Sequence, residues 1–149
     1  MAYFDDPVQL VDYVYDKVDQ NKGPLGIAYL GYGEELLIPE FPAALFLPGA
    51  VAREWHGTHT WNITLLIEIW VYHARLSDSH RVRTRDDMQL VASVRDLLHS
   101  DIRLRDVSGE PQCAGSWVNA EDPAFINRRS DVVIGSRLEF TCISQQRFK

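Results

Sequence analysis

The amino-acid sequence predicts an α+β domain: a mostly antiparallel sheet of about four to five strands with two helices packed on one face. Two segments carry apolar residues three or four positions apart, as amphipathic helices do, and one long segment alternates strictly, as a strand does. Short turns separate consecutive strand segments, which favours antiparallel pairing, and both helices can then share a face. The 149 residues suffice for one core, so we assign residues 1–149 to a single domain.

The first predicted element is a helix from Pro7 to Gln20. Asp6 can accept a hydrogen bond from a free N–H of the first turn, and Pro7 suits the first helical position. The run from Asn21 to Pro24 ends the helix. An apolar stripe is formed by Val8, Val11, Val14, Tyr15 and Val18.

Strand patterns dominate the next fifty residues. We predict short strands at Leu25 to Leu30 and at Ala43 to Leu47, and a loop or bend from Gly49 to Gly57. The clearest strand is Thr58 to Ala74, where apolar and polar residues alternate. At about 3.3 Å per residue it would span ~55 Å, so we expect it to bend at a bulge or to project beyond the sheet.

The second half of the chain carries the other helix and the last strands. Thr84 and Asp87 resemble a capping box, which places the helix start there, or earlier near Ser79. His99 lies in the last turn, where a positive charge is favoured. The apolar face of this helix is Met88, Val91, Val94, Leu97 and Leu98. The strands that follow are predicted at Ile102 to Val107, at Cys113 to Ala120, ended by Glu121-Asp122-Pro123, and at Asp131 to Ser144.

Composition excludes several classes of protein. Fifteen Lys and Arg against twenty-one Asp and Glu give a net charge of −6, which disfavours tight nonspecific binding to nucleic acid. The two cysteines, Cys113 and Cys142, lie far apart, which argues against a disulfide scaffold or a zinc module and favours a reduced, cytoplasmic history. We expect no secretory signal and no membrane span.

The motifs that carry chemistry are weak. His56 and His59 lie three positions apart beside a strand, where odd offsets point to opposite faces, so we interpret them as strand-entry residues rather than metal ligands. Gly31 and Gly33 begin a dinucleotide-like loop, but Leu36 stands where the third glycine belongs. The sequence therefore predicts no catalytic residue, no metal site and no cofactor.

Two features indicate a contact surface instead. Trp70 and Leu66 are apolar residues on the more polar face of the long strand, which leaves two interpretations, an interface or a second core layer. Arginines cluster near His73 and His80, either as a surface for a partner or DNA, or as a solvated connection paired with neighbouring aspartates. The arginines of this cluster are Arg75, Arg81, Arg83 and Arg85.

Several segments, in order, resemble the tail terminator proteins of long-tailed, non-contractile bacteriophages. The similarity extends from about Leu25 to Ser144, and its specificity comes from the succession of segments rather than from one motif. The segments are Leu37 to Ala44, Pro48-Gly49, Arg53 to Thr60, Ile67 to Ala74, Leu90 to His99 and Val133 to Leu138.

The resemblance implies a lambda-terminator-like α+β fold and a homohexameric ring. Such a ring caps the tail tube in the virion, stops its polymerisation and presents a surface to the head–neck connector. It implies no catalytic residue and no obligatory cofactor. The partners would be other copies of the chain, the tail tube protein and the connector proteins, while genomic DNA passes through the lumen without specific binding and no membrane is involved.

From the long strand we derive a hypothesis for ring closure: it projects as an edge and pairs with a neighbouring subunit. Its polar positions would face that neighbour or an acidic or neutral lumen, with the arginine cluster turned elsewhere. The candidate interface residues are Thr58, Thr60, Asn62, Thr64, Leu66, Glu68, Trp70, Arg75, Arg81, Arg83 and Arg85.

Two alternatives stay open at this point. A head–tail connector, stopper or tail-completion protein of the phage neck would have a similar size. A small-ligand or metal-binding enzyme domain would use Glu54, His56 and His59.

Overall fold

The computed structural model describes residues 4, 6–33, 38–55, 57, 59–75, 80–128 and 131–147; the side chains at 74–75, 80–84, 123–128, 131–134 and 146–147 lie outside this description. It contains a five-stranded, mostly antiparallel sheet and three helices, two of them long, so the predicted α+β fold is confirmed. The elements are α1 (Pro7–Gln20), α2 (Lys22–Leu25), β1 (Tyr29–Tyr32), β2 (Ala43–Trp55), β3 (Thr60–Arg75), α3 (His80–His99), β4 (Gly115–Arg128) and β5 (Asp131–Arg147).

The strand order is β1-β2-β3-β5-β4, with β1 parallel to β2 and all other neighbours antiparallel. The long strand β3 is therefore the centre of the sheet, paired with β2 on one side and β5 on the other. The hypothesis that it projects as a free edge is wrong. The bulge expected in the long strand is present between Tyr72 and Ala74, against β5, and a second irregularity, which was not predicted, lies in β2 between Pro48 and Val51.

Two strands are longer than predicted. Of the expected loop from Gly49 to Gly57, the part from Gly49 to Trp55 is instead the second half of β2, and β4 continues through Pro123 instead of ending there. Pro48 of β2 and Pro123 of β4 each lie where the strand has a neighbouring strand on one side only among the described residues. β4 is an edge strand, and β1 covers β2 only from Ala43 to Phe46. A proline on an unpaired strand edge removes no ladder hydrogen bond, so the strand can pass through it.

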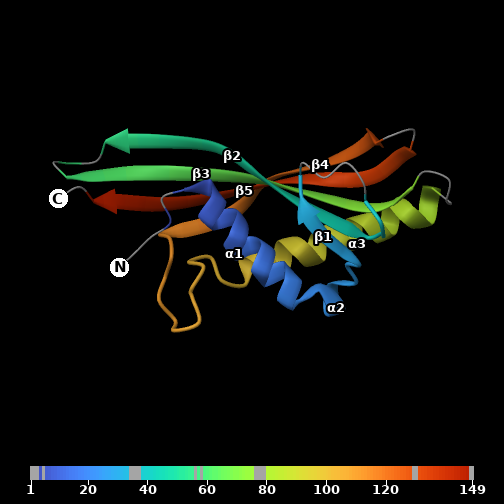
Figure 1. Ribbon diagram of the computed structural model, residues 1–149, viewed down its shortest axis with the longest axis horizontal. Helices are drawn as coiled ribbons and strands as arrows, with labels where there is room; N and C mark the ends of the chain where they lie inside the picture. The colour runs from blue at the N-terminus through green and yellow to red at the C-terminus, as the bar shows by residue number, and fades with distance from the viewer. Residues whose placement is uncertain are drawn as a thin grey trace.

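All three helices lie on one face of the sheet (Figure 1). Alternate residues of β3 from Ile63 to Val71 are 0% exposed against them, as the strand pattern predicts. Helix α1 begins as predicted, because Asp6 caps it by accepting a hydrogen bond from the Val8 N–H at 2.7 Å. Its buried stripe contains Leu10 in place of the predicted Val8, which is 51% exposed.

Three local predictions fail at least in part. Helix α3 begins at His80, which agrees with the earlier of the two predicted starts, near Ser79, whereas Thr84 and Asp87 are interior residues and not a capping box. The predicted strand Ile102 to Val107 is a loop, because the Asp101 carboxylate accepts hydrogen bonds from the backbone N–H groups of Arg103 and Arg105. Such side-chain bonds to the backbone compete with strand pairing. The predicted strand at Leu25 to Leu30 is likewise replaced, by α2, a left-handed Gly26 and the start of β1.

The end of the sheet that carries the β2–β3 turn and the carboxyl end of β5 extends past the helices (Figure 1). There Trp55 and Trp61 stack edge to face, with ring centroids 4.4 Å apart. Trp61 packs against the core, but Trp55 is 55% exposed and Trp117, on β4, is 41% exposed. Trp55 and Trp117 are therefore largely surface residues and not core residues.

Candidate assembly surface

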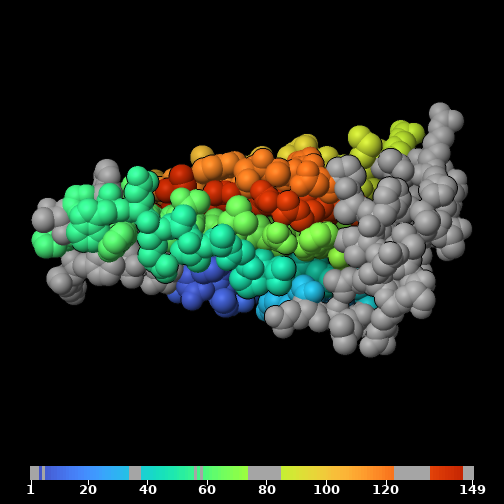
Figure 2. Space-filling model, turned by 90° about the horizontal axis from the view of Figure 1, so that it is seen from above, coloured from blue at the N-terminus to red at the C-terminus, as the bar shows by residue number. Residues whose placement is uncertain are grey.

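The face of the sheet opposite the helices is the site of the predicted interface residues, and Figure 2 shows it from above with β2, β3, β5 and β4 side by side. Strand pleating places every second residue of β3 on this face, which we call the open face. Of the predicted interface residues on this face, Thr64 is exposed and the other described ones are half-buried. The predicted residues brought together here are Thr60, Asn62, Thr64, Leu66, Glu68 and Trp70, while Thr58 lies outside the described residues.

Trp70 belongs to a second, smaller core. It packs with Tyr72 and with buried Ile38, Ala43 and Leu45, at the end of the open face nearest β1. Its indole N–H donates a hydrogen bond to Glu68 Oε2 at 3.1 Å. Of the two interpretations left open for Trp70, the structure therefore supports the second core layer.

The most charged feature of the open face is a cluster around Arg137 of β5. Its guanidinium lies 2.8 Å from a carboxylate oxygen of Glu68, 2.8 Å from one of Glu139 and 3.3 Å from one of Asp122. These residues come from three adjacent strands, and the strand register brings them together. The three carboxylates raise the pKa of Arg137, most strongly through the hydrogen bond with Glu139, so it stays positively charged.

The cluster continues through the bulge in β4. Asn119, the extra residue of this bulge, donates a hydrogen bond to Glu139 at 3.0 Å and accepts one from Thr141 at 2.7 Å. The described charged side chains of the open face are those of Glu54, Glu68, Asp122, Glu139 and Arg137. Because four carboxylates outnumber one guanidinium, and three of them surround it, the described part of this face carries a net negative charge.

Sequence reasoning did not identify Arg137, Glu139, Asp122 or Asn119. The four residues are dispersed over two strands, and each alone resembles an ordinary exposed strand residue. The available signal was alternation in the last strand, where Arg137, Glu139 and Thr141 occupy every second position.

Of the predicted arginine cluster, the structure describes one side chain. Arg85 is an exposed residue of α3, and the side chains of Arg75, Arg81 and Arg83 lie outside the described part of the chain. Near them, Asp87 is 5% exposed and accepts a hydrogen bond from Ser136 at 2.9 Å. Burial raises the pKa of Asp87, while Ser136 and His73 oppose that shift. The Nε2 atom of His73 lies 3.8 Å from a carboxylate oxygen of Asp86.

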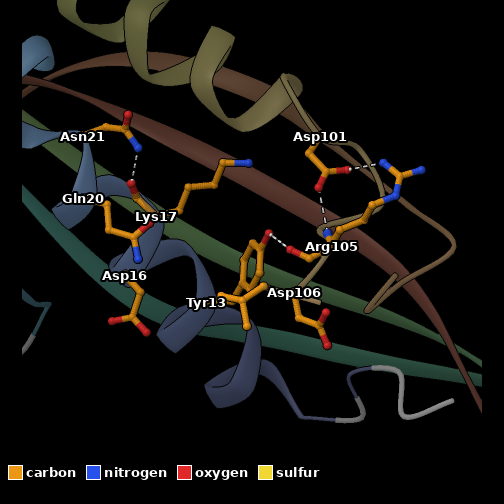
Figure 3. Close-up of a pocket in the computed structure, with 9 residues that line it drawn as sticks. Tyr13, Asp16, Lys17, Gln20, Asn21, Asp101, Arg105 and Asp106 are labelled. Carbon is orange, nitrogen blue, oxygen red and sulfur yellow. Dashed lines mark hydrogen bonds and ion pairs between the residues drawn. The ribbon is translucent and has the colours of Figure 1, made fainter. Parts of the chain in front are cut away.

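A cleft of about 430 Å³ lies on the helix side, between α1 and the loop after α3 (Figure 3). Tyr13 donates a hydrogen bond to the Arg105 carbonyl at 2.8 Å, and Asp101 forms an ion pair with the Arg105 guanidinium at 3.1 Å. The two contacts tie the loop to the helix (Figure 3). Burial, helped by Asp101, raises the pKa of Tyr13, so the phenol remains a hydrogen-bond donor. Tyr13, Asp101 and Arg105 therefore serve as hydrogen-bond or ion-pair partners for one another, as residues of a structural contact do.

The enzyme alternative gains no geometric support from the part of the chain that the structure describes. No group of three or more His, Cys, Asp or Glu side chains there lies close enough together to hold a metal ion. His56 is outside that part. Among the described helices, none is both long enough and apolar enough to cross a membrane.

A scan against protein-family models finds no match to this chain, and a search of curated proteins finds no similar sequence.

Proposed function

We propose that this chain is the tail terminator of a long-tailed, non-contractile bacteriophage. Six copies form a ring that caps the tail tube, stops its polymerisation and presents a surface to the head–neck connector. The proposal starts from the ordered similarity of segments between Leu25 and Ser144. It places the protein at the tail–neck junction of the virion, and in the host cytoplasm during assembly.

The observation that carries the proposal furthest is the division of the sheet into two unlike faces. One face is covered by α1 and α3, and the other carries an acidic cluster centred on Arg137. A ring through which DNA passes needs a surface that does not bind phosphate. A surface with more carboxylates than basic groups does not bind phosphate, because nonspecific DNA binding depends on Lys and Arg displacing counterions. We therefore assign the open face to the lumen.

Arrest of tube growth tests the function. The tail tube protein of the same phage is polymerised alone and with this protein added, and tube lengths are measured by negative-stain microscopy. We expect tubes that stop at a shorter length and carry a ring at one end. Unchanged tube lengths with no bound protein would contradict the proposal.

A binding comparison separates the terminator from the neck alternative. The purified protein is incubated with tail tubes and, separately, with portal–connector complexes. A terminator binds tubes in the absence of the connector, whereas a connector or stopper protein binds the portal complex first. Preferential binding to the portal complex would replace the proposed function with the neck alternative.

A further inference from the structure

Strands β2 and β4 each carry a stretch of backbone that has a partner strand on one side only among the described residues. The described part of β1 pairs with β2 only from Ala43 to Phe46, and no described strand pairs with that edge of β2 from residue 47 to Trp55. On the other side β4 has β5 on one side only. Free strand edges expose N–H and C=O groups that can pair with a further strand.

The free part of β4 begins after Val118. The Val118 N–H donates a hydrogen bond to Nε2 of His99, at the end of α3, at 3.0 Å. This contact occupies the edge at that position, because a side chain takes the place of a partner strand. Residues 119–128 remain, a stretch that matches the free part of β2 in length.

The directions of the two edges are also compatible. Along the sheet, β2, β3, β5 and β4 alternate in direction. When β2 of one copy is placed beside β4 of the next with the open faces on the same side, the two strands are antiparallel. The junction therefore continues the alternation of the sheet, and the same contact can be repeated from copy to copy. A repeated contact between two different surfaces closes a ring when its rotation returns to the first copy, and gives an open filament when it does not.

One pair of side chains on the helix side of these edges is complementary in charge. Arg53 is exposed on β2, opposite buried Ile63, so it lies on the helix side of the sheet, where no described side chain pairs with it. Glu121 of β4, opposite buried Leu138, lies on the same side, and its carboxylate is held 3.1 Å from Arg95. A register that places Arg53 opposite Glu121 aligns the two free stretches over their length.

We propose that copies of this chain join head to tail, with the free part of β2 of one copy pairing antiparallel to the free part of β4 of the next. The inference rests on the proposed ring and names the surfaces that close it. It replaces the earlier hypothesis of pairing through β3, because β3 has partners on both sides.

The test uses one cysteine on each edge. Ala52 of β2 and Ala120 of β4 both lie on the open face, opposite Thr64 and Glu139, and both are small. The chain is prepared as Ala52→Cys, as Ala120→Cys and as the double variant, and each is treated with a short bis-maleimide. Each thiol adds across one maleimide double bond, so no oxidant is needed. The native thiols of Cys113 and Cys142 are 0% exposed and serve as the wild-type control.

A mixture of the two single variants should give about tenfold more cross-linked dimer than either variant alone, since contact raises the local thiol concentration. The double variant should give a ladder of covalent oligomers that ends at the closed ring. Strong cross-linking of Ala52→Cys alone or of Ala120→Cys alone would show a two-fold contact between identical edges and overturn the inference. Equal, low yields in all samples would also overturn it.

Light scattering on the same samples before cross-linking separates the two proposals. Rings without the Ala52–Ala120 cross-link would contradict the edge pairing and leave the terminator function in place. Circular dichroism melting of each variant checks that the substitutions leave the fold intact. The tube-arrest assay on wild-type protein decides the function independently of both results.

Discussion

Arg137 of β5 donates a hydrogen bond to Glu68 of β3 at 2.8 Å, across the two central strands on the face that no helix covers. The ion pair is partly shielded, since the two side chains are 24% and 26% exposed. Glu139 and Asp122 share the same guanidinium. Removing the positive charge would leave three carboxylates facing one another.

Replacing Arg137 by Gln should lower the free energy of unfolding by about 1 kcal/mol at low salt, because the carboxylates then repel without compensation. Urea unfolding at low and high salt measures the effect, which should shrink in high salt. Arg95→Gln, which removes the surface pair with Glu121, is the matched control and should cost less. A loss for Arg137→Gln no larger than that of Arg95→Gln would contradict the described cluster.

Burial of Asp87 predicts a pH dependence with a definite sign. Because its pKa is raised in the folded protein, the folded state holds the proton more tightly than the unfolded state. Its contribution to stability is therefore largest below the ordinary aspartate pKa and is lost as the pH rises through the raised value. Asp87→Asn should be more stable than wild type at neutral pH, and this advantage should disappear in acid.

Thermal unfolding between pH 3 and pH 8 measures that difference. The Asn side chain can still accept the hydrogen bond from Ser136, so the packing is retained. Asp86→Asn, at a more exposed neighbour, serves as the control. An advantage for Asp87→Asn that is constant over the whole range would be inconsistent with a raised pKa.

Gly135 of β5 has no room for a side chain. A Cβ there would overlap the Val71 carbonyl oxygen and lie 2.9 Å from Cδ1 of the Tyr72 ring. Gly135→Ala should therefore destabilise the fold by about 3 kcal/mol, the upper end for overpacking, because the obstacle is backbone. Gly115→Ala, in β4, has nothing within 4 Å of the added carbon and should be nearly neutral. Denaturant unfolding of the pair checks this, and similar stabilities would contradict the close strand approach.

The lumen assignment predicts a change in DNA binding. Thr64 is exposed at the centre of the open face, and Thr64→Arg would add one positive charge per subunit there. Rings of this variant should retain short duplex DNA at about 50 mM salt and release it at about 200 mM, because such binding depends on counterion release. Gln89→Arg adds the same charge to an exposed position of α3. Gln89→Arg is therefore the control. If filter binding shows that the two variants retain equal amounts of DNA, the assignment of the open face to the lumen is contradicted.

The sequence predicts those elements whose signals are local. Asp6 and Pro7 mark the start of α1, and the alternation from Thr58 to Ala74 identifies β3, Thr60–Arg75, to within two residues at each end. The extents of β2 and β4 were underestimated because Pro48 and Pro123 end a strand only when that strand is paired on both sides. Whether a strand has neighbours on both sides depends on the strand order of the sheet, which the alternation pattern does not reveal.

The candidate site is less accessible to sequence reasoning. The polar residues of β3 share a face because strands are pleated, and the sequence shows that directly. The contact between Glu68 and Arg137 joins residues 69 positions apart and depends on the register of β3 with β5. Likewise, the sequence shows His99 only as a basic residue at a helix end, whereas its Nε2 accepts a hydrogen bond from the Val118 N–H of another element.

The mass and shape of the purified protein test the central claim most directly. Light scattering combined with negative-stain imaging should show a particle of about 103 kDa, six copies of the 17.1 kDa chain, with an open centre. A particle of 17.1 kDa at every concentration, both free and in the presence of tail tubes, would contradict the account.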